Sequence, residues 1–187
     1  MPHFTAAGDD GMTTLYGPGR VPKHHPQPET FGAVDEATSA LGLARALSVG
    51  PRTDALVRGI QERFYLIMAE LAVVRGEPIP PSFLTTAAHV EALETIAAEL
   101  EAEVPLPSQF VLPGATAAGG ALDLARSLTR RAEREASRLQ AGGHPLNPEI
   151  LRYLNRASSV LFALARYEEH HAGRSAPRAT RQGVQDT

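Results

Sequence analysis

Residues 29–47, ETFGAVDEATSALGLARAL, decide the fold class of this chain. Apolar side chains recur there every three to four residues, the spacing that places them on one face of an α-helix. Gly50 and Pro51 follow and end the pattern, because neither residue favours a helix interior. We therefore predict a helix over residues 29–47 with one buried face, made of Phe31, Val34, Ala37, Leu41 and Ala44.

Two further helices are predicted before residue 105. The second has Thr53 as its N-cap and ends at Gly76, before the proline-rich break at residues 78–81. The third covers about residues 90–104, and its glutamates fall largely off the apolar stripe, which predicts a solvated acidic face. The two apolar stripes are Leu56, Ile60, Phe64, Ile67, Leu71 and Val74, then Val90, Leu93, Ala97, Leu100 and Val104.

The second half of the chain predicts two more helices. The fourth follows Gly114 and ends before Gly142 and Gly143, and the fifth opens with Asn147 as N-cap and Pro148 in its first turn. Their apolar stripes are Ala121, Leu124, Leu128, Ala132 and Leu139, then Ile150, Leu154, Ala157, Leu161 and Leu164.

Five helices without an internal repeat or a strand-alternation pattern predict an all-α, up-and-down five-helix bundle with short connections. Residues 1–27 are rich in glycine and proline and predict an ordered or ligand-ordered loop. The bundle is expected over residues 28–172. Residues 173–187 are polar and are expected to form a disordered tail.

Composition narrows the possible functions. The 187 residues carry a net charge of -3, so no global positive field attracts nucleic acid, and no nucleic-acid partner is expected. The chain has no cysteine, which excludes disulfides, thiolate metal sites and a cysteine nucleophile. The first residues do not resemble a signal peptide and no apolar run is long enough to span a membrane. We therefore expect a cytoplasmic protein without membrane association.

Helical geometry groups polar side chains on two of the predicted helices. On the fourth, Arg126, Arg130, Glu133 and Ser137 lie within about 60 degrees of one another, so two guanidinium groups could clamp a polyphosphate or carboxylate. A solvated surface face is the alternative. On the first predicted helix, one face carries small side chains, which would let a partner approach closely. This face consists of Asp35, Thr38, Ser39 and Gly42.

Two other features allow a functional and a structural interpretation. Phe110 lies in an apolar loop ended by Pro113 and Gly114, where a phenylalanine is usually a core residue. Glu168 and His171 have the spacing of one di-iron half-site, but such sites need two. We therefore expect these two side chains to cap the last helical turn and to be solvated.

An ordered series of motifs resembles the PduO-type ATP:cob(I)alamin adenosyltransferase family over about residues 4–172. Each motif alone is weak evidence for the family, whereas the whole ordered series with its spacing is specific to it. The motifs are GDDGMTTL at residues 8–15, RVPK at 20–23, FGAVDE at 31–36, SALG at 39–42, FVLPG at 110–114, AR at 125–126, RRAER at 130–134 and YLNRAS at 153–158.

The resemblance implies a ferritin-like bundle that forms a homotrimer, with ATP and cobalamin bound between neighbouring subunits. It also implies an electron-donating reductase and an adenosylcobalamin-dependent enzyme as partners, and Mg²⁺ carried with ATP. The implied ATP-binding residues are Thr5, Gly8, Asp9, Gly11, Thr13, Thr14, Lys23, Arg130, Glu133 and Asn155.

Other residues take catalytic and corrinoid-binding roles by the same resemblance. Asp35 and Arg126 would form a partly buried bridge across the subunit boundary, with Ser39 near the corrinoid. Phe110 would press on the corrin face and keep the lower axial ligand off cobalt, which eases reduction to Co(I). Arg130 would stand beside the reacting ATP.

Several residues depart from the family pattern. Ala6 and Ala7 replace a basic residue and a threonine, so two phosphate contacts are absent, with Arg20 and His24 as candidate substitutes. The remaining departures are Pro18 within a glycine run, Thr38 for an asparagine and Ser159 for an aspartate. A non-catalytic relative that binds corrinoid or nucleotide as a carrier or sensor is the alternative function.

Overall fold

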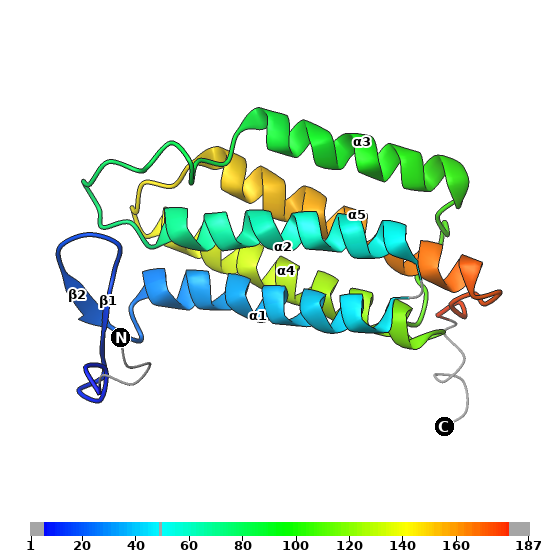
Figure 1. Ribbon diagram of the computed structural model, residues 1–187, viewed down its shortest axis with the longest axis horizontal. Helices are drawn as coiled ribbons and strands as arrows, with labels where there is room; N and C mark the ends of the chain where they lie inside the picture. Colours follow the sequence, from blue (N-terminus) through cyan, green and yellow to red (C-terminus); the bar gives the residue numbers. More distant parts are fainter. Residues whose placement is uncertain (1–5, 49, 180–187) are drawn as a thin grey trace, which may run out of the picture.

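The computed structural model describes residues 6–48 and 50–179, which form five helices and a small two-stranded sheet (Figure 1). This architecture confirms the predicted helical bundle. The elements are β1 (Met12–Thr14), β2 (Arg20–Pro22), α1 (Pro26–Leu47), α2 (Pro51–Leu71), α3 (Ala87–Glu103), α4 (Ala117–Ala141) and α5 (Pro148–His171).

Four of the helices form a closed ring and the fifth lies outside it. α1 packs on α2 and α4, and α5 closes the ring by packing on α4 and α2. α3 packs its backbone closely on α5. It meets α2 through side chains, because Arg52 pairs with Glu99 and Glu103, and Arg63 contacts His89. Successive helices run in opposite directions, as Figure 1 shows, so the up-and-down prediction is correct for direction. The close backbone contacts of α3 are nevertheless with α5, and not with α2 or α4, the helices before and after it in the described chain.

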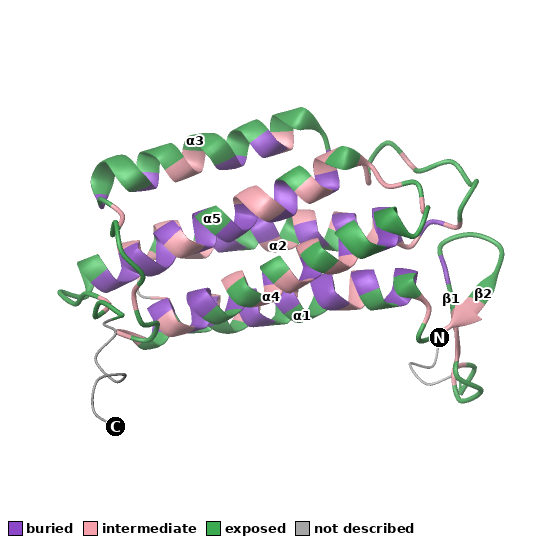
Figure 2. Cartoon of the chain, turned by 180° about the vertical axis from the view of Figure 1, so that it is seen from behind, coloured by how far each residue is buried: buried purple, intermediate pink, exposed green. Residues whose placement is uncertain are grey.

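The core lies inside the ring, where the apolar helix faces meet (Figure 2). Alanines dominate the facing sides of α1 and α4, which lets these two backbones approach closely. Every residue of the stripe predicted for α5 is buried. On α4 the prediction is wrong for Leu124, which is 49% exposed, while Leu122 and Ala125 are fully buried in its place.

The N-terminal segment forms a hairpin where a loop was predicted. β1 and β2 pair antiparallel, with Thr13 opposite Val21. Tyr16, between the strands, donates its backbone N–H to the Ala72 carbonyl at 2.7 Å and accepts from Val74 N–H at 3.0 Å. This pairing explains why α2 ends at Leu71 and not at Gly76, because the chain leaves the helix to extend along Tyr16.

The predicted cap of α2 is also wrong, whereas that of α5 is confirmed. Gly50 is the N-cap of α2 and Pro51 starts the helix, while Thr53 is fully buried within its first turn. Asn147 caps α5, and its side-chain oxygen accepts from the Glu149 N–H at 3.1 Å.

The connections differ in length, although all were expected to be short. Residues 48–50 and 142–147 join neighbouring helices directly, but residues 72–86 and 104–116 are long because they carry the chain to and from the outer helix α3. The segment after α5 is not a free tail up to residue 179. It pairs with the second long connection through a β-bridge between Val111 and Arg178.

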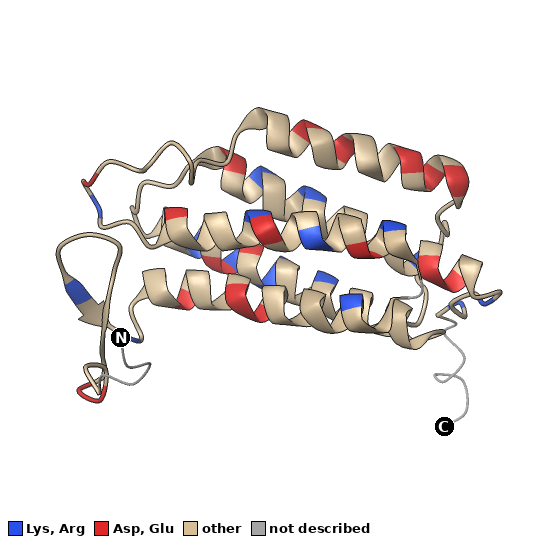
Figure 3. Cartoon of the chain, viewed as in Figure 1, with Lys and Arg blue, Asp and Glu red and all other residues tan. Residues whose placement is uncertain are grey.

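Charged residues are distributed unevenly over the helices (Figure 3). The five glutamates of α3 are exposed, as predicted. Glu168 and Glu169 near the end of α5 are 2% and 1% exposed, so the expectation that Glu168 is solvated is wrong. No described helix has the length and apolar character to cross a membrane.

Candidate functional site

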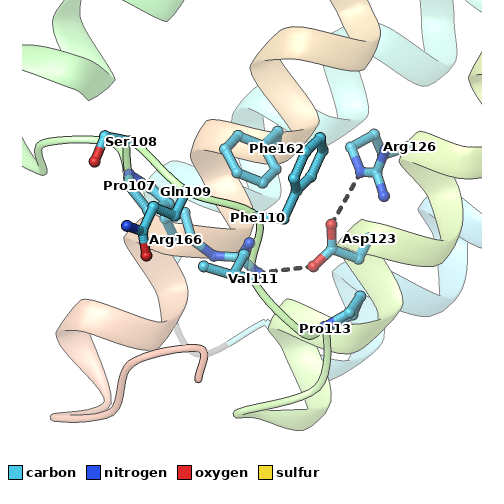
Figure 4. A pocket seen from close by; sticks show the side chains of 10 residues that line it. All are labelled: Pro107, Ser108, Gln109, Phe110, Val111, Pro113, Asp123, Arg126, Phe162 and Arg166. Atoms are coloured by element: carbon cyan, nitrogen blue, oxygen red, sulfur yellow. Dashed lines mark hydrogen bonds and ion pairs between the residues drawn. The ribbon is translucent and has the colours of Figure 1, made fainter. Parts of the chain in front are cut away.

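A pocket of about 440 Å³ lies at the end of the bundle where α4 begins and α5 ends (Figure 4). The connection between α3 and α4 forms one wall, because Pro107 and Pro113 keep its backbone out of regular structure. Phe110 in this wall is 89% exposed, so the core interpretation of this side chain is wrong. The opposite wall carries Phe162, Asp123, Arg126 and Arg166.

The charged side chains of this opposite wall belong to a buried group of alternating charges that continues into the bundle. Asp123 accepts from Arg126 Nε at 3.0 Å and from Arg166 Nη2 at 2.7 Å. Arg166 also donates to both carboxylate oxygens of Glu169, at 2.7 and 3.0 Å, and its guanidinium lies 5.0 Å from the centre of the Phe162 ring. Asp123, Arg166 and Glu169 are each less than a tenth exposed, so each charge is balanced within the group.

The polar face predicted on α4 continues from this pocket along the helix. Arg126 and Glu133 are half-buried, and Arg130 between them is exposed. Glu133 Oε1 accepts from Asn155 Nδ2 at 3.0 Å, which places these two predicted nucleotide contacts side by side across α4 and α5. Arg130 has no hydrogen-bond partner among the residues that the structure describes, so its charge is available to a ligand.

The candidate residues of α1 face outward. Asp35 and Ser39 are exposed, and Asp35 pairs with no residue of the described chain. The predicted partner of Asp35, Arg126, is bound within this subunit by Asp123 through its Nε alone. The nearby Arg131 ties α4 to α1 through Glu29 and Glu36.

The hairpin holds the predicted glycine-rich residues, except Thr5, which lies outside the described residues. Gly11 has a φ of 78°, which favours glycine, and its carbonyl accepts from Lys23 N–H at 2.9 Å. A Cβ on Gly8 would lie 3.1 Å from Lys23 Nζ, so the ammonium group crosses directly over this turn. Gly8, Asp9, Thr13, Thr14 and Lys23 are therefore gathered in one small unit.

Arg20 has partners inside the same hairpin. It donates to both oxygens of Asp10 at 2.9 Å and to the Ala7 carbonyl. The hydrogen bond from Arg20 lowers the pKa of the Asp10 carboxyl, with a further contribution from the Met12 N–H. As a candidate phosphate ligand, Arg20 would have to leave these partners, whereas His24 is exposed.

The two groups of predicted residues lie at opposite ends of one subunit. The hairpin adjoins the start of α1, and the Phe110 pocket lies by the start of α4 at the far end of the bundle (Figure 1). A helix of 22 residues such as α1 is about 33 Å long, which is far more than an ATP molecule could bridge to a cobalt atom. A single chain therefore does not bring all the predicted residues together.

Sequence reasoning missed Asp123, Arg166 and Glu169. A partial signal was present, because Asp123 and Arg126, like Arg166 and Glu169, are opposite charges three residues apart on one helix. The contact between Asp123 and Arg166 joins two helices and had no sequence signal. Within the described chain, no group of three or more histidine, aspartate or glutamate side chains is placed to hold a metal ion.

The fold and this site define a helical-bundle protein with an exposed aromatic residue over a charged pocket at one end. Residues 3–168 match the cobalamin adenosyltransferase family, and the chain belongs to that family. The family resemblance drawn from the motifs is thereby confirmed.

Three known proteins illustrate the relationship. The chain is 36% identical over 172 residues to the corrinoid adenosyltransferase PduO of Citrobacter freundii, covering 92% of this chain and 51% of that protein. It is 36% identical to the corrinoid adenosyltransferase of Bacillus subtilis, in an alignment that covers 92% of this chain and 89% of that protein. The third is the structure of a variant PduO-type ATP:corrinoid adenosyltransferase of Lactobacillus reuteri, complexed with cobalamin and ATP. It superposes on this chain with a TM-score of 0.85 at 28% identity, and the superposition covers 95% of this chain and 99% of that one. The chain spans about half the length of the first curated relatives that it matches.

Proposed function

We propose that this protein transfers the 5'-deoxyadenosyl group of ATP to cob(I)alamin and releases triphosphate. The observation that carries this proposal is the exposed Phe110 ring over a pocket from which Arg126, Arg130 and the Glu133–Asn155 pair continue along one face. An apolar ring presented to solvent suits the flat face of a corrin. The similar Lactobacillus reuteri structure holds both cobalamin and ATP.

We propose further that the complete site forms between subunits of a homotrimer. The separation of the hairpin from the Phe110 pocket supports this, since a neighbouring copy can bring its hairpin to the exposed face of α4. Asp35 supports it as well, because an exposed carboxylate without a partner in its own described chain is free to reach Arg126 of the next subunit. Arg126 keeps its terminal Nη atoms available for that contact.

At the corrinoid end, Phe110 excludes the lower axial ligand and water from cobalt. Loss of that ligand favours the electron-rich Co(I) state, because fewer donors push charge onto the metal. Ser39 and Asp35 from α1 of the neighbouring subunit border the corrinoid on the other side. The pocket supplies shape and exclusion of water, and it needs no acid or base for this step.

At the nucleotide end, the electron pair of Co(I) forms a bond to the ribose 5' carbon as the bond from that carbon to the triphosphate oxygen breaks. Negative charge then develops on the leaving triphosphate. Lys23 and Arg130 neutralise it, and Glu133 and Asn155 orient the nucleoside. Thr5, Gly8, Asp9, Gly11, Thr13 and Thr14 wrap the phosphates with hydroxyl and backbone N–H groups.

The remaining components follow from this chemistry. Mg²⁺ would be held mainly by the phosphate oxygens of ATP, as is usual for this ion. Co(II) must be reduced before each transfer, so an electron-donating reductase is the expected partner, in the cytoplasm. The product would pass to an adenosylcobalamin-dependent enzyme.

The hairpin favours one alternative, a carrier or sensor that binds without turnover. Ala6 and Ala7 supply no phosphate ligand from their side chains, and Arg20 is engaged by Asp10. Two missing phosphate contacts would weaken ATP binding by about ten to a thousandfold. The alternative therefore predicts corrinoid binding without adenosylation.

An anaerobic assay of the purified protein with cob(I)alamin and MgATP decides between the two functions. Loss of Co(I) absorbance with ATP-dependent formation of adenosylcobalamin supports the enzyme. A Co(II) spectral change without product supports the carrier or sensor. Phe110→Ala should slow Co(II) reduction at least tenfold with little effect on ATP affinity, whereas Leu112→Ala in the same connection should change either value by less than about threefold.

A further inference from the structure

Asp123 stands between two arginines and uses a different oxygen for each. Oδ1 accepts from Arg126 Nε at 3.0 Å, and Oδ2 accepts from Arg166 Nη2 at 2.7 Å (Figure 4). The Asp123 side chain is 4% exposed, whereas that of Arg126 is 27% exposed and lines the pocket. Asp123 therefore links the wall of the pocket to the interior of the bundle.

Arg166 and Glu169 anchor this link on α5. Glu169 binds the Nε and Nη2 edge of Arg166 with both of its oxygens, which is the rigid bidentate geometry of an arginine and a carboxylate. Glu169 is itself fixed by close packing against the first turn of α4. A Cβ on Gly119 would lie 2.8 Å from Glu169 Oε1, so only a glycine fits there.

Only one edge of the Arg126 guanidinium group is bound by Asp123. Its Nε is occupied by Asp123, while its terminal Nη atoms bond to no residue of the described ranges 6–48 and 50–179. An arginine without the Asp123 contact would sample many rotamers, and ordering it at each encounter would cost conformational entropy. With Nε fixed, the Nη atoms are already oriented when a ligand or a second subunit arrives.

We propose that Asp123, anchored by Arg166 and Glu169, is a positioning residue that fixes Arg126 for its role in the adenosyl transfer. This inference rests on the proposed function, because it assigns Arg126 to that site. The positioning role of Asp123 is distinct from a purely structural role, in which the buried charges would only stabilise the fold. Buried ion pairs often add little net stability compared with apolar residues, so stability alone does not explain this group.

The first test is Asp123→Asn. Asparagine has a single acceptor oxygen, so its amide nitrogen must face one of the two guanidinium groups and one contact is lost. We expect kcat to fall about ten to a hundredfold, the range for residues that orient a functional group, while the KM for ATP stays within about threefold. Wild-type kcat in a folded Asp123→Asn protein would overturn the proposal.

A matched control is Glu70→Gln. Glu70 is also a buried carboxylate that accepts hydrogen bonds, from the Thr85 N–H and hydroxyl and from Asn147 Nδ2, but it lies at the other end of α2 and α5. Its loss should lower the melting temperature without lowering kcat in the folded protein. An equal fall in kcat for both variants would show a general effect of buried charge and would overturn the proposal.

Two further measurements separate positioning from folding. A kinetic cycle with Arg126→Lys should be non-additive, because each change removes the same contact. Additive effects on kcat would overturn the proposal. If Asp123→Asn does not fold, the charge-balanced variant Arg166→Met/Glu169→Gln keeps the Asp123–Arg126 pair but removes its anchor, and it should also lower kcat.

Exchange of the Arg126 Nε–H with solvent, followed by nitrogen-15 NMR of the full chain, tests the geometry without turnover. Exchange should be at least tenfold faster in Asp123→Asn than in the wild type and unchanged in Glu70→Gln. Equal exchange in all three proteins would overturn the positioning. A wild-type protein that makes no adenosylcobalamin but shows this difference would refute the proposed function alone.

Discussion

Ala179 donates its backbone N–H to the carbonyl oxygen of Phe110 at 2.8 Å. Leu112 N–H donates to the Pro177 carbonyl at the same distance, so two hydrogen bonds hold the segment after α5 against the connection that carries Phe110. The position of the exposed ring therefore depends on residues more than 60 positions away in the sequence.

Truncation after Ala176 should loosen the Phe110 connection. Both hydrogen bonds and the bridge to Arg178 are removed, while the hydrogen bonds within the helices are retained. We expect exchange of the Leu112 amide hydrogen to increase at least tenfold and that of the helix interiors to stay unchanged. Truncation after Ala179 is the control, since it retains both bonds and should leave exchange as in the full chain.

Arg130→Ala should lower turnover at least a hundredfold without affecting the fold. Arg130 is exposed and has no partner among the described side chains, so its removal breaks no internal contact, but the triphosphate loses a cation in the transition state. Arg134→Ala removes another exposed arginine, one turn further along α4, that also has no partner in the part of the chain that the structure describes, and it should keep turnover within about twofold. The readouts are steady-state kcat and thermal melting, and normal turnover of Arg130→Ala would remove this residue from the site.

Mixed oligomers test the proposed homotrimer and the proposed contact between Asp35 and Arg126 of different subunits. Asp35→Ala and Arg126→Ala should each be nearly inactive alone. In a one-to-one mixture unfolded and refolded together, about a quarter of the interfaces combine the intact residue from each parent, so about a quarter of the wild-type rate should return. Mixing Asp35→Ala with the double variant should restore nothing, and equal rates in the two mixtures would argue against a shared site.

Gly119→Ala should destabilise the protein although alanine favours helices. The new methyl group would lie 2.8 Å from Glu169 Oε1 and 2.9 Å from its Cγ, and the buried ion pairs prevent Glu169 from moving away. We expect a loss of about 1–3 kcal/mol in the free energy of unfolding. Gly59→Ala on α2 meets no atom within 4 Å and should instead stabilise by about 0.5–1 kcal/mol. Denaturant unfolding measures both, and a stabilising Gly119→Ala would show that Glu169 is mobile.

Stability should fall in mild acid through His89. Burial and then the nearby Arg63 guanidinium, 2.7 Å from His89 Nε2, lower the pKa of this imidazole, and Nδ1 accepts the Thr86 N–H that caps α3. The unfolded chain therefore binds more protons below about pH 6.5, so the contribution is complete above that pH and is lost as the pH falls toward the folded pKa.

The variant His89→Gln provides the comparison for this acid effect. Glutamine keeps the capping contact but does not titrate. Its melting temperature should fall less than that of the wild type between about pH 7.5 and about pH 5.5. Equal falls would show that His89 does not contribute to the pH dependence.

Much of the fold followed from the sequence because helix signals are local. The apolar spacing of residues 29–47 and the Asn147–Pro148 start were sufficient to predict α1 and α5, and an i to i+4 pattern needs no knowledge of the partner helix. The grouping of Arg126, Arg130 and Glu133 on one face of α4 was local in the same sense. The order of the motifs then identified the family.

Contacts between distant segments were decided by the tertiary structure alone. The Tyr16 pairing that ends α2 at Leu71, and the Asp123–Arg166 pair, each join positions whose local patterns are ordinary. The same holds for the exposure of Phe110, since an apolar loop residue is buried or presented according to what packs beneath it. Periodicity determines which residues of a helix share a face, but only packing determines what that face meets, because burial energies depend on partners that the local sequence does not contain.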